Sequence, residues 1–424
     1  DYSLGVAHRE TDGFDACENT DPFTGPCYTD EPDDDGYERD SAHVQAGYRF
    51  GDGGHVRASG ITSSAEVEYD GDTNGLGTNR SKIEQRTLGL SASTGRIGFW
   101  QMRARAGRHL DHQDYFQNQN LDSNLDTQRD TLSLANDFFI APSTSVTVGA
   151  DQTYDKLSSS SDYEKNSRRN QALFAQINTT LGEKLDIQGA VRRDFNEQFG
   201  TANTGSLDLA YALTDRWTVT AGHGTAFTAP SFNLLYYPGA SNPDLDPEKT
   251  RTSRIGTTWT DRNWSAGITA FRSRNRDMIV SYPENGYVPY NIEKATVRGA
   301  EADVTWSDDD WSASATLTYL STENEESGEH LPRQPRWSGR VNLDRDFGRF
   351  SLGTSFHGRS NSEGGEWAED NEGFVTADLR GAYRINADWR LEARVENIFD
   401  RDYQVVHGYN QAPRGVFVSL RYGR

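Results

Sequence analysis

The segment "GFDACENTDPFTGPCYTDEPDDDGYERD" (13–40) concentrates the side chains that could do chemistry. Its acidic residues include Asp15, Asp21, Asp30, Glu31, Asp33, Asp34 and Asp35. Side chains of one charge at this density repel each other unless water or a cation separates them, and calcium accepts six to eight oxygens from irregular loops. Counted from Glu31, the twelfth position of an EF-hand loop would be Ala42, whereas an EF-hand has a calcium-binding glutamate there. The segment is therefore not an EF-hand. Composition alone leaves calcium binding and plain solvation equally open.

The same segment contains the only two cysteines, Cys17 and Cys27. Two cysteines this close together in a secreted chain predict a disulfide. In the loop-entropy model, a bridge over so short a loop stabilises the folded chain by roughly 2–3 kcal/mol. The spacing is not C-x-x-C, which disfavours a metal or redox pair.

Other residues with chemical potential form weaker patterns. "RHLDHQD" (108–114) carries His109, Asp111 and His112, which could bind a metal, although polar residues at the rim of a fold explain the pattern better. No P-loop, G-x-S-x-G or dinucleotide-binding motif occurs, so we expect neither enzymatic activity nor a catalytic cofactor. The net charge of −21 argues against a nucleic-acid partner, because phosphate binding needs a basic surface.

Composition limits the folds that could position these residues. The chain has 424 residues, of which 34% are hydrophobic, and a mean hydropathy of −0.81, which is poor material for a large buried core. Its 19 Tyr, 19 Phe and 9 Trp argue against disorder. It has no run of 18 apolar residues that would form a membrane-spanning helix. It also opens without a signal peptide, which we interpret as a mature or trimmed product.

Alternation of apolar and polar residues predicts β-strands along the whole chain. In "ADLRGAYRI" (377–385), for example, Ala377 and Leu379 share one face while Asp378 lies on the other. The stretch "GVFVSLRYG" (415–423) alternates in the same way. We find no sustained helical period.

Short and long connections alternate between these strands. Short turns such as "LTDR" (213–216) and "SDDD" (307–310) are separated by long polar stretches such as 108–129 and 195–202, which leaves about 20 strands of roughly 9–12 residues. Strands of this length cross a membrane when tilted, and outer-membrane barrels have short periplasmic turns and long extracellular loops. We therefore predict an all-β fold, a transmembrane antiparallel up-and-down β-barrel. Neighbouring acidic loops of such a barrel could share cations.

The tryptophans support this orientation. In "WTDRNW" (259–264) and "WSDDDW" (306–311), two tryptophans bracket a short turn. Tryptophan prefers the membrane interface, where the ring is half buried and its N–H stays hydrated. We predict a periplasmic aromatic girdle formed by Trp100, Trp217, Trp259, Trp264, Trp306, Trp311 and Trp389.

Several segments resemble the barrel of TonB-dependent outer-membrane receptors. "GTAFTAPSFNLLYYPGASNPDLDPEKT" (224–250) is similar to a family strand end followed by an "NPxLxPE" loop, in which we expect Glu248 to accept backbone hydrogen bonds. "ARVENIFDRDYQVVHGYNQAPRGVFVSLRYG" (393–423) resembles the last two family strands, and "NIEKATVRGAEADVTW" (291–306) fits another. The resemblance runs through the whole chain and implies a transporter in the bacterial outer membrane.

Within this family the closest likeness is to the cobalamin (vitamin B12) receptors, which bind calcium through loop aspartates. The matching patterns are "GFD", "ENT", "DDDG" and "EYD". The resemblance implies calcium ligands at Asp15, Asp33, Asp35 and Asp70, with Asp34 and Asp72 as second-rank candidates. Asn79 stands where the family has a further aspartate.

The resemblance also indicates what is missing. The family barrel has 22 strands around an N-terminal plug domain with a TonB box, and this chain begins near the third strand. We therefore interpret residues 1–424 as a barrel domain incomplete at its N-terminus, which would reach the TonB system only through the missing plug.

The expected partners are cobalamin or another metal chelate, and outer-membrane lipid, for a monomeric protein. The contact residues for the ligand are unknown, because loop packing explains the loop aromatics equally well: Tyr236, Tyr237, Tyr287, Tyr290 and Trp367. A ferric-siderophore receptor and a passive channel are the alternatives.

Overall fold

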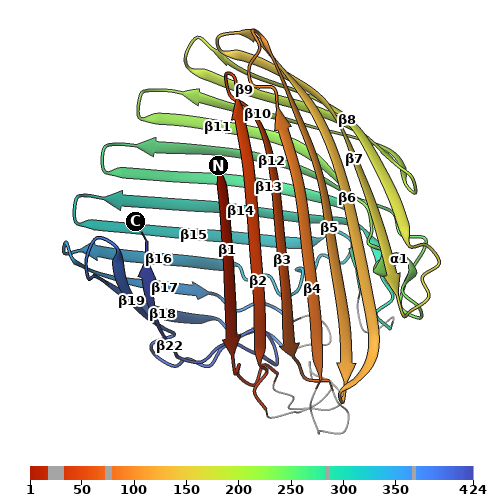
Figure 1. Cartoon of the computed structure of the whole chain (residues 1–424), viewed down its shortest axis with the longest axis vertical. Helices are drawn as coiled ribbons and strands as arrows, with labels where there is room; N and C mark the ends of the chain where they lie inside the picture. Colours follow the sequence, from red (N-terminus) through yellow and green to blue (C-terminus); the bar gives the residue numbers. More distant parts are fainter. Residues whose placement is uncertain (18–32, 72–78, 282–285, 365–368, 424) are drawn as a thin grey trace.

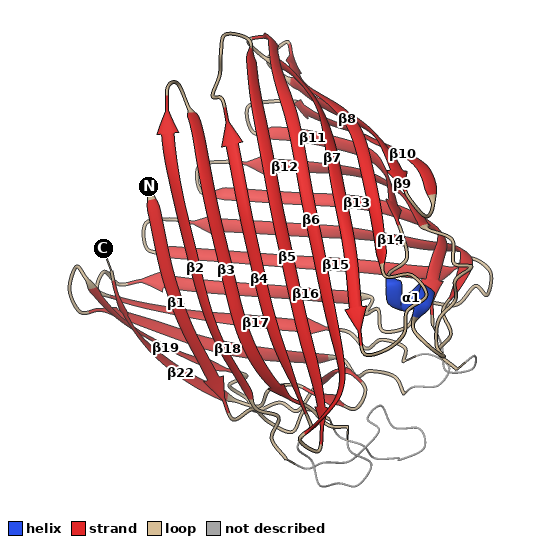
Figure 2. Ribbon diagram, turned by 45° about the vertical axis from the view of Figure 1, so that its right-hand side comes forward, coloured by secondary structure: helices blue, strands red, loops and turns tan. Residues whose placement is uncertain are grey.

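The computed structural model describes residues 1–17, 33–71, 79–281, 286–364 and 369–423, except the side chain of residue 293. Six candidate residues of the sequence analysis lie outside the described residues: Asp21, Cys27, Asp30, Glu31, Asp72 and Trp367. Within the described part, twenty strands form one sheet that curls around a hollow (Figures 1 and 2).

The first half of the sheet is formed by β1 (Tyr2–Thr11), β2 (Tyr37–Phe50), β3 (Gly54–Glu68), β4 (Arg80–Ser93), β5 (Trp100–Gln117), β6 (Asn120–Ala141), β7 (Thr144–Ser159), β8 (Ser167–Leu181), β9 (Leu185–Asn196) and β10 (Gly200–Ala212). The second half is formed by β11 (Trp217–Thr228), β12 (Glu248–Thr260), β13 (Trp264–Val280), β14 (Tyr290–Ser307), β15 (Trp311–Asn324), β16 (Trp337–Asp346), β17 (Phe350–Arg359), β18 (Phe374–Arg384), β19 (Trp389–Glu396) and β22 (Gly415–Tyr422). The short strands β20 (Gln404–Val406) and β21 (Tyr409–Asn410) form a separate hairpin.

Successive strands of the sheet pair antiparallel, which confirms the predicted up-and-down order. The first strand, β1, pairs only with β2, and the last, β22, pairs only with β19, so the described sheet is not closed into a complete barrel. Turns such as 213–216 and 307–310 lie at one end of the strands, which we call the short-turn end. We call the opposite end the long-loop end.

Two of the connections predicted to be long are not loops. Strand β5 continues to Gln117 and β6 begins at Asn120, so only Asn118 and Gln119 join them. Similarly, only residues 197–199 join β9 to β10. The prediction was wrong because polarity was taken to indicate a loop, whereas the polar residues of β5 and β6 pair across the strands. These strands are also longer than predicted, with 22 residues in β6.

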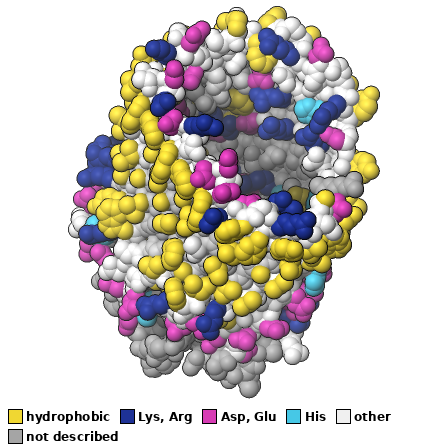
Figure 3. Space-filling model, turned by 90° about the vertical axis from the view of Figure 1, so that its left-hand side faces the viewer, with side chains coloured by type: hydrophobic (Ala, Val, Ile, Leu, Met, Phe, Trp, Pro, Cys, Tyr) yellow, Lys and Arg dark blue, Asp and Glu magenta, His cyan; other side chains and the backbone are white. Residues whose placement is uncertain are grey.

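Alternate residues of each strand face the lumen and the outside. On β12 and β13, Ile255 and Ile268 are 61% and 52% exposed on the outer face, whereas Arg254 and Thr269 line a cavity in the lumen. The space-filling view shows charged side chains in the hollow and hydrophobic side chains on the surface beside it (Figure 3). This distribution is the reverse of a soluble protein and suits a wall between lipid and water.

A small hydrophobic core lies at the long-loop end, under the short helix α1 (Phe232–Tyr236). Its buried members are Leu157, Phe232, Leu235, Tyr236 and Leu245. Ser231 caps the helix by accepting a hydrogen bond from the Leu234 N–H. This single helical turn was not predicted, because it is too short to produce a periodic pattern. No helix in the described residues is long and apolar enough to span a membrane.

Candidate functional site

The acidic segment after β1 folds back on itself at the long-loop end. The Ala16 N–H donates to Oδ2 of Asp35 at 3.1 Å, and the Asp35 N–H donates to the Phe14 carbonyl at 3.2 Å. The Cys17 N–H donates to Oδ1 of Asp15 at 3.2 Å. Asp35 therefore holds the two sides of this loop together, whereas Asp15 stabilises the local turn before Cys17.

Glu68, which the sequence analysis did not select, joins this cluster from the end of β3. Its carboxylate accepts the Gly36 N–H at 2.9 Å, and its own N–H donates to the Gly36 carbonyl at 2.9 Å. The available signal was its position in "EVEYD", two residues before Asp70. Glu68 therefore adds a carboxylate to the acidic loop.

The neighbouring acids affect the pKa of the Asp35 carboxyl group. Burial raises the pKa of Asp35, the hydrogen bond from Ala16 lowers it, and the charges of Asp33, Asp15 and Glu68 raise it further. A carboxyl group in such surroundings holds its negative charge at a cost in free energy. A divalent cation at this position would remove that cost.

The second acidic loop is tied to the β5–β6 hairpin through Asn79. Asn79 is 3% exposed, its carbonyl accepts the Tyr69 N–H at 3.2 Å, and its Oδ1 accepts the Asn118 N–H at 3.3 Å. Asp70 lies half-buried next to Tyr69. Asn79 therefore links the second acidic loop to the β5–β6 hairpin by hydrogen bonds with neighbouring backbone.

The four predicted calcium ligands do not converge tightly in this structure. Among the described residues, one group of at least three His, Asp or Glu side chains has possible ligand atoms all within 4.8 Å of one another. That group is His8, Glu38 and Asp40 on β1 and β2, all exposed. Calcium binding by Asp15, Asp33, Asp35 and Asp70 therefore stays a prediction, as does a role for Asp34.

The predicted disulfide also stays a prediction. Cys17 is 6% exposed and forms an isolated β-bridge with Tyr409, while Cys27 lies outside the described residues. The Asn410 N–H donates to the Ala16 carbonyl at 3.0 Å. These contacts fix the Cys17 side of the loop against the β20–β21 hairpin.

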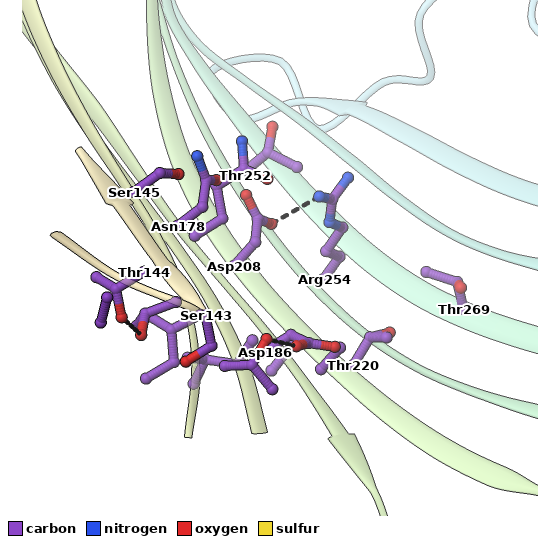
Figure 4. Close-up of a pocket in the computed structure, with 18 of the residues that line it drawn as sticks. Ser143, Thr144, Ser145, Asn178, Asp186, Asp208, Thr220, Thr252, Arg254 and Thr269 are labelled. Atoms are coloured by element: carbon purple, nitrogen blue, oxygen red, sulfur yellow. Dashed lines mark hydrogen bonds and ion pairs between the residues drawn. The ribbon is translucent and has the colours of Figure 1, made fainter. Parts of the chain in front are cut away.

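The lumen contains a cavity of about 980 Å³ beside β7 to β14, near the short-turn end. Figure 4 shows its polar lining, in which Nη2 of Arg254 donates to Oδ1 of Asp208 at 2.6 Å. Thr144 and Thr179 share a hydrogen bond of 2.7 Å, and Thr180 donates to Asp186 at 2.6 Å. This polar wall, in which Arg254 and Asp208 are paired, suits contact with water or with a polar protein surface.

Other lumen charges are paired in the same way. Arg103 on β5 makes two hydrogen bonds to Asp137 on β6, of 2.6 and 2.7 Å, and Thr147 donates to the same carboxylate at 2.7 Å. Two-point Arg–carboxylate contacts are stronger and more directional than single hydrogen bonds. They fix the polar side chains that face the lumen.

The loop aromatics differ in their surroundings. Tyr236 is 6% exposed within the small core and accepts a hydrogen bond from Gln198 at 2.6 Å, so it packs inside the loop region. Tyr237 is 44% exposed and Tyr287 56% exposed. Tyr290 begins β14 opposite Val280. Tyr237 and Tyr287 therefore have the most surface available for a ligand, and the half-buried Tyr290 has less.

The seven tryptophans of the predicted girdle all lie at the short-turn end. Trp217 faces Trp259 across β11 and β12, and Trp264 faces Trp306 across β13 and β14, with the last two ring centres 5.9 Å apart. The remaining members, Trp100, Trp311 and Trp389, each begin a strand after a short turn. Their role at a membrane interface stays a prediction.

Two other expectations can be compared with the structure. Glu248 accepts the Ile279 N–H at 2.8 Å, which confirms its predicted backbone hydrogen bond. His112 contacts Asp126 and Asp114, while His109 contacts Thr87. The 108–114 segment lies within β5 and not at the rim of the fold, so its position was predicted wrongly, and its histidines contact side chains of the neighbouring strands.

A family model, TonB dependent receptor-like beta-barrel, matches residues 8–398. The chain belongs to this family. It is therefore a barrel of the receptor and transporter class, in the outer membrane of Gram-negative bacteria. The vitamin B12 transporter BtuB of Photobacterium profundum is 24% identical over 434 residues, which cover 99% of this chain and 68% of that relative.

Solved structures share the barrel fold. The copper transporter OprC superposes with a TM-score of 0.83 at 16% identity, over 99% of this chain and 75% of that one. A ferric enterobactin receptor mutant (PfeA) from Pseudomonas aeruginosa gives 0.82 at 19% identity, over 99% and 76%. At these identities the likeness shows the fold alone. The short-turn end of the receptor is periplasmic and the long-loop end extracellular.

Proposed function

We propose that this protein is a receptor for TonB-dependent uptake of cobalamin, with extracellular loops ordered by calcium. The observation that carries the proposal is the fold of the first acidic loop around the partly buried Asp35, whose carboxylate accepts the Ala16 N–H, with Glu68 bonded to the adjacent Gly36. The similarity to a vitamin B12 transporter over 99% of the chain supports the choice of ligand. A ferric siderophore or another metal chelate is the alternative ligand.

The candidate ligands fit a calcium ion chemically, because they offer oxygen donors from carboxylates, with backbone carbonyls nearby. Asp15, Asp33 and Asp35 would hold the ion, with Glu68 beside them and Asp70 contributed by the next loop. When bound, calcium supplies positive charge that reverses the repulsion among these acids. The loops would then lose less conformational entropy when cobalamin docks, which tightens binding through preorganisation.

We further propose that additional segments of the full-length protein complete the barrel. Strands β1 and β22 both have one edge that pairs with no other described strand, and exposed edges of this kind favour pairing with another chain. Two further strands would close the wall, and a plug domain would occupy the polar lumen and carry the TonB box. Without a plug, the same barrel would act as a passive channel.

The test is titration calorimetry of cobalamin into the full-length protein, with calcium and with a chelator. We expect calcium to tighten cobalamin binding, and the Asp33→Ala plus Asp70→Ala variant to lose both this effect and the heat of calcium binding. Asp309→Ala, an exposed acid in a short turn, is the matched control and should behave like the wild type.

Three outcomes would contradict the proposal. Tight binding of a ferric siderophore with no heat from cobalamin would overturn the choice of ligand. Negligible calcium heat in both the wild type and the double variant would show that the loops are merely solvated. Large, steady conductance of the full-length protein in planar bilayers would favour the channel.

A further inference from the structure

The outer wall carries a group of basic residues near the long-loop end, which we call the basic patch. Strand β12 contributes Lys249 and Arg251, β13 contributes Arg272, Arg274 and Arg276, and β14 contributes Lys294 and Arg298. All seven side chains share the outer face with Ile255 and Ile268. Those of β12 lie an even number of residues from Ile255, and those of β13 lie an even number from Ile268. Lys294 and Arg298 of β14 pair with Arg276 and Arg272 across the strands. A concentration of positive charge is unexpected in a chain of net charge −21.

Positive side chains are directly opposed within the patch. Arg276 stands between Lys249 and Lys294 in the strand register, and Arg272 stands opposite Arg298. Like charges placed directly across strands destabilise a sheet. The strand pairing therefore keeps these cations together against their repulsion.

Nearby carboxylates neutralise only part of this charge. Lys249 pairs with Asp277 at 3.0 Å, and Arg298 pairs with Glu323 at 3.7 Å. Within the described residues, no carboxylate oxygen lies within 4.0 Å of the other five cations.

A third carboxylate, Glu325 in the adjoining loop, interacts electrostatically with cations of the basic patch. A hydrogen bond from Thr296 lowers the pKa of Glu325, desolvation opposes this effect, and the charges of Arg274, Arg272 and Lys294 lower the pKa further. Seven cations therefore face three described acids, which leaves an excess of positive charge.

An apolar groove lies next to the basic patch on the same outer face. It encloses about 370 Å³ and is lined by Ala302, Leu317, Gly339, Val341, Gly358 and Val375, among others. Across β14 to β18, Ala302, Leu317, Gly339, Gly358 and Val375 lie in one register row. The groove exists because the two glycines have no side chains between the larger neighbours on either side.

The patch and the groove meet on β14. Arg298 and Ala302 lie four positions apart on the same face, which is about 13 Å along a strand. Along β14, towards the short-turn end, the basic patch is thus followed by the apolar groove. This order matches an amphiphile with an anionic head and a hydrocarbon chain.

The height of the patch agrees with this arrangement. Arg272 lies eight positions beyond Trp264 on β13, which is about 26 Å along the strand and about 20 Å of height for a tilt near 40°. The apolar band of such barrels is about 25 Å tall. Arg272 and Arg298 therefore lie just inside the outer boundary of the hydrocarbon, Arg274 lies at that boundary, where lipid headgroups begin, and the groove lies within the hydrocarbon.

On the opposite wall of the barrel, β4 and β5 carry cations at the same height, but these cations have acidic partners. Arg108 lies eight positions beyond Trp100 on β5, and it makes hydrogen bonds of 2.6 and 2.9 Å to Asp130. Arg86 pairs with Glu84 at 3.0 Å. Arg86 and Arg108 are thus neutralised by acids of the same surface, whereas most cations of the basic patch are not.

We propose that this wall binds a phosphorylated lipid of the outer leaflet, with its phosphate groups on the basic patch and an acyl chain in the apolar groove. Guanidinium groups recognise phosphate by two-point hydrogen bonds, which favours arginine over lysine in such a site. Bound phosphate would also relieve the repulsion between the opposed cations. The proposal is independent of the transported ligand.

The experiment is native mass spectrometry of the full-length protein in neutral detergent with added diphosphorylated lipid A. The variant Arg251→Gln, Arg274→Gln and Arg298→Gln should reduce the lipid-bound fraction at least about tenfold, the scale expected from losing charge-assisted hydrogen bonds to phosphate. Removal of the lipid phosphates should reduce the binding of wild type equally. Ala302→Phe, which fills the groove, should weaken binding of the lipid but not of inorganic phosphate.

The matched control is Arg86→Gln plus Arg108→Gln, which removes paired cations from the opposite wall and should leave lipid binding unchanged. Each variant is first checked for a folded barrel by its resistance to unfolding in sodium dodecyl sulfate. Equal loss in the control, or full binding by the patch variant, would overturn the proposal. Displacement of the lipid by inorganic phosphate, together with unchanged binding by Ala302→Phe, would assign the patch to soluble anions and also overturn it.

Discussion

Arg251 and Arg274 stand directly opposite each other across β12 and β13, on the outer face of the barrel. In the described chain, neither guanidinium has a carboxylate oxygen within 4.0 Å. Cross-strand pairs of like charge weaken a sheet, so this arrangement does not contribute to folding. Its explanation must lie in what the outer surface contacts.

The first prediction follows from that repulsion. Arg274→Gln should raise the free energy of unfolding in lipid-free neutral detergent by roughly 0.2–1 kcal/mol at low ionic strength. The gain should shrink at about 0.5 M salt, because salt screens exposed charges. Urea unfolding followed by tryptophan fluorescence measures both effects. Arg108→Gln is the control and should not stabilise, since it removes a cation paired with Asp130; a destabilised Arg274→Gln would contradict the prediction.

The second prediction concerns pH and Asp35. Burial raises the pKa of this carboxyl above its ordinary value of 3.8, and neighbouring acids raise it further against the Ala16 hydrogen bond. A raised folded-state pKa favours the folded loop when the carboxyl is protonated, so without calcium the loop should gain stability as pH falls through that pKa. With calcium the sign reverses, because the ion needs the carboxylate.

Hydrogen exchange of the Ala16 and Cys17 amides tests this prediction. In the presence of a chelator, protection should increase on acidification in wild type and should be independent of pH in Asp35→Asn. With calcium, acidification should reduce protection in wild type. The same trend in both calcium conditions would show that Asp35 does not control the loop.

The third prediction concerns Cys17 and Cys27. If they form a disulfide, a reducing agent should increase proteolysis within residues 12–36 and leave the barrel folded, because the bridge closes only that loop. Thiol titration under denaturing, non-reducing conditions should find no free thiol, and two free thiols would refute the bridge. Cys17→Ser plus Cys27→Ser should reproduce the effect of reduction.

The sequence predicted the sheet and its order well because the alternation of residues and the short turns are local signals. Trp264 and Trp306, for instance, could be placed at one end from their positions beside short turns, and the structure pairs them. The closeness of Glu68 to Asp35 could not be predicted, because it depends on contact between segments 32 residues apart. The basic patch was missed because its opposed cations depend on the exact register of three neighbouring strands.

The hairpin of β5 and β6 was missed because its turn lacks the usual signal. Two-residue hairpin turns with positive φ at both positions favour Asn-Gly. Here the residues are Asn118 and Gln119, with φ of 48° and 67°. Asparagine tolerates this conformation, whereas the Cβ of glutamine makes it unfavourable. The hairpin forms because the cross-strand contacts of β5 and β6 offset the strain at Gln119.

This strain leads to the last prediction. Gln119→Gly should stabilise the hairpin tip by about 1 kcal/mol, because glycine adopts positive φ without a steric penalty. Gln119→Ala is the matched control, since it removes the long side chain but keeps the Cβ, and it should give no gain. Hydrogen exchange at the Asn120 amide, which follows the turn, measures the difference. Equal protection in both variants would show that the turn is not strained, and that the polar strands alone determine the stability of the tip.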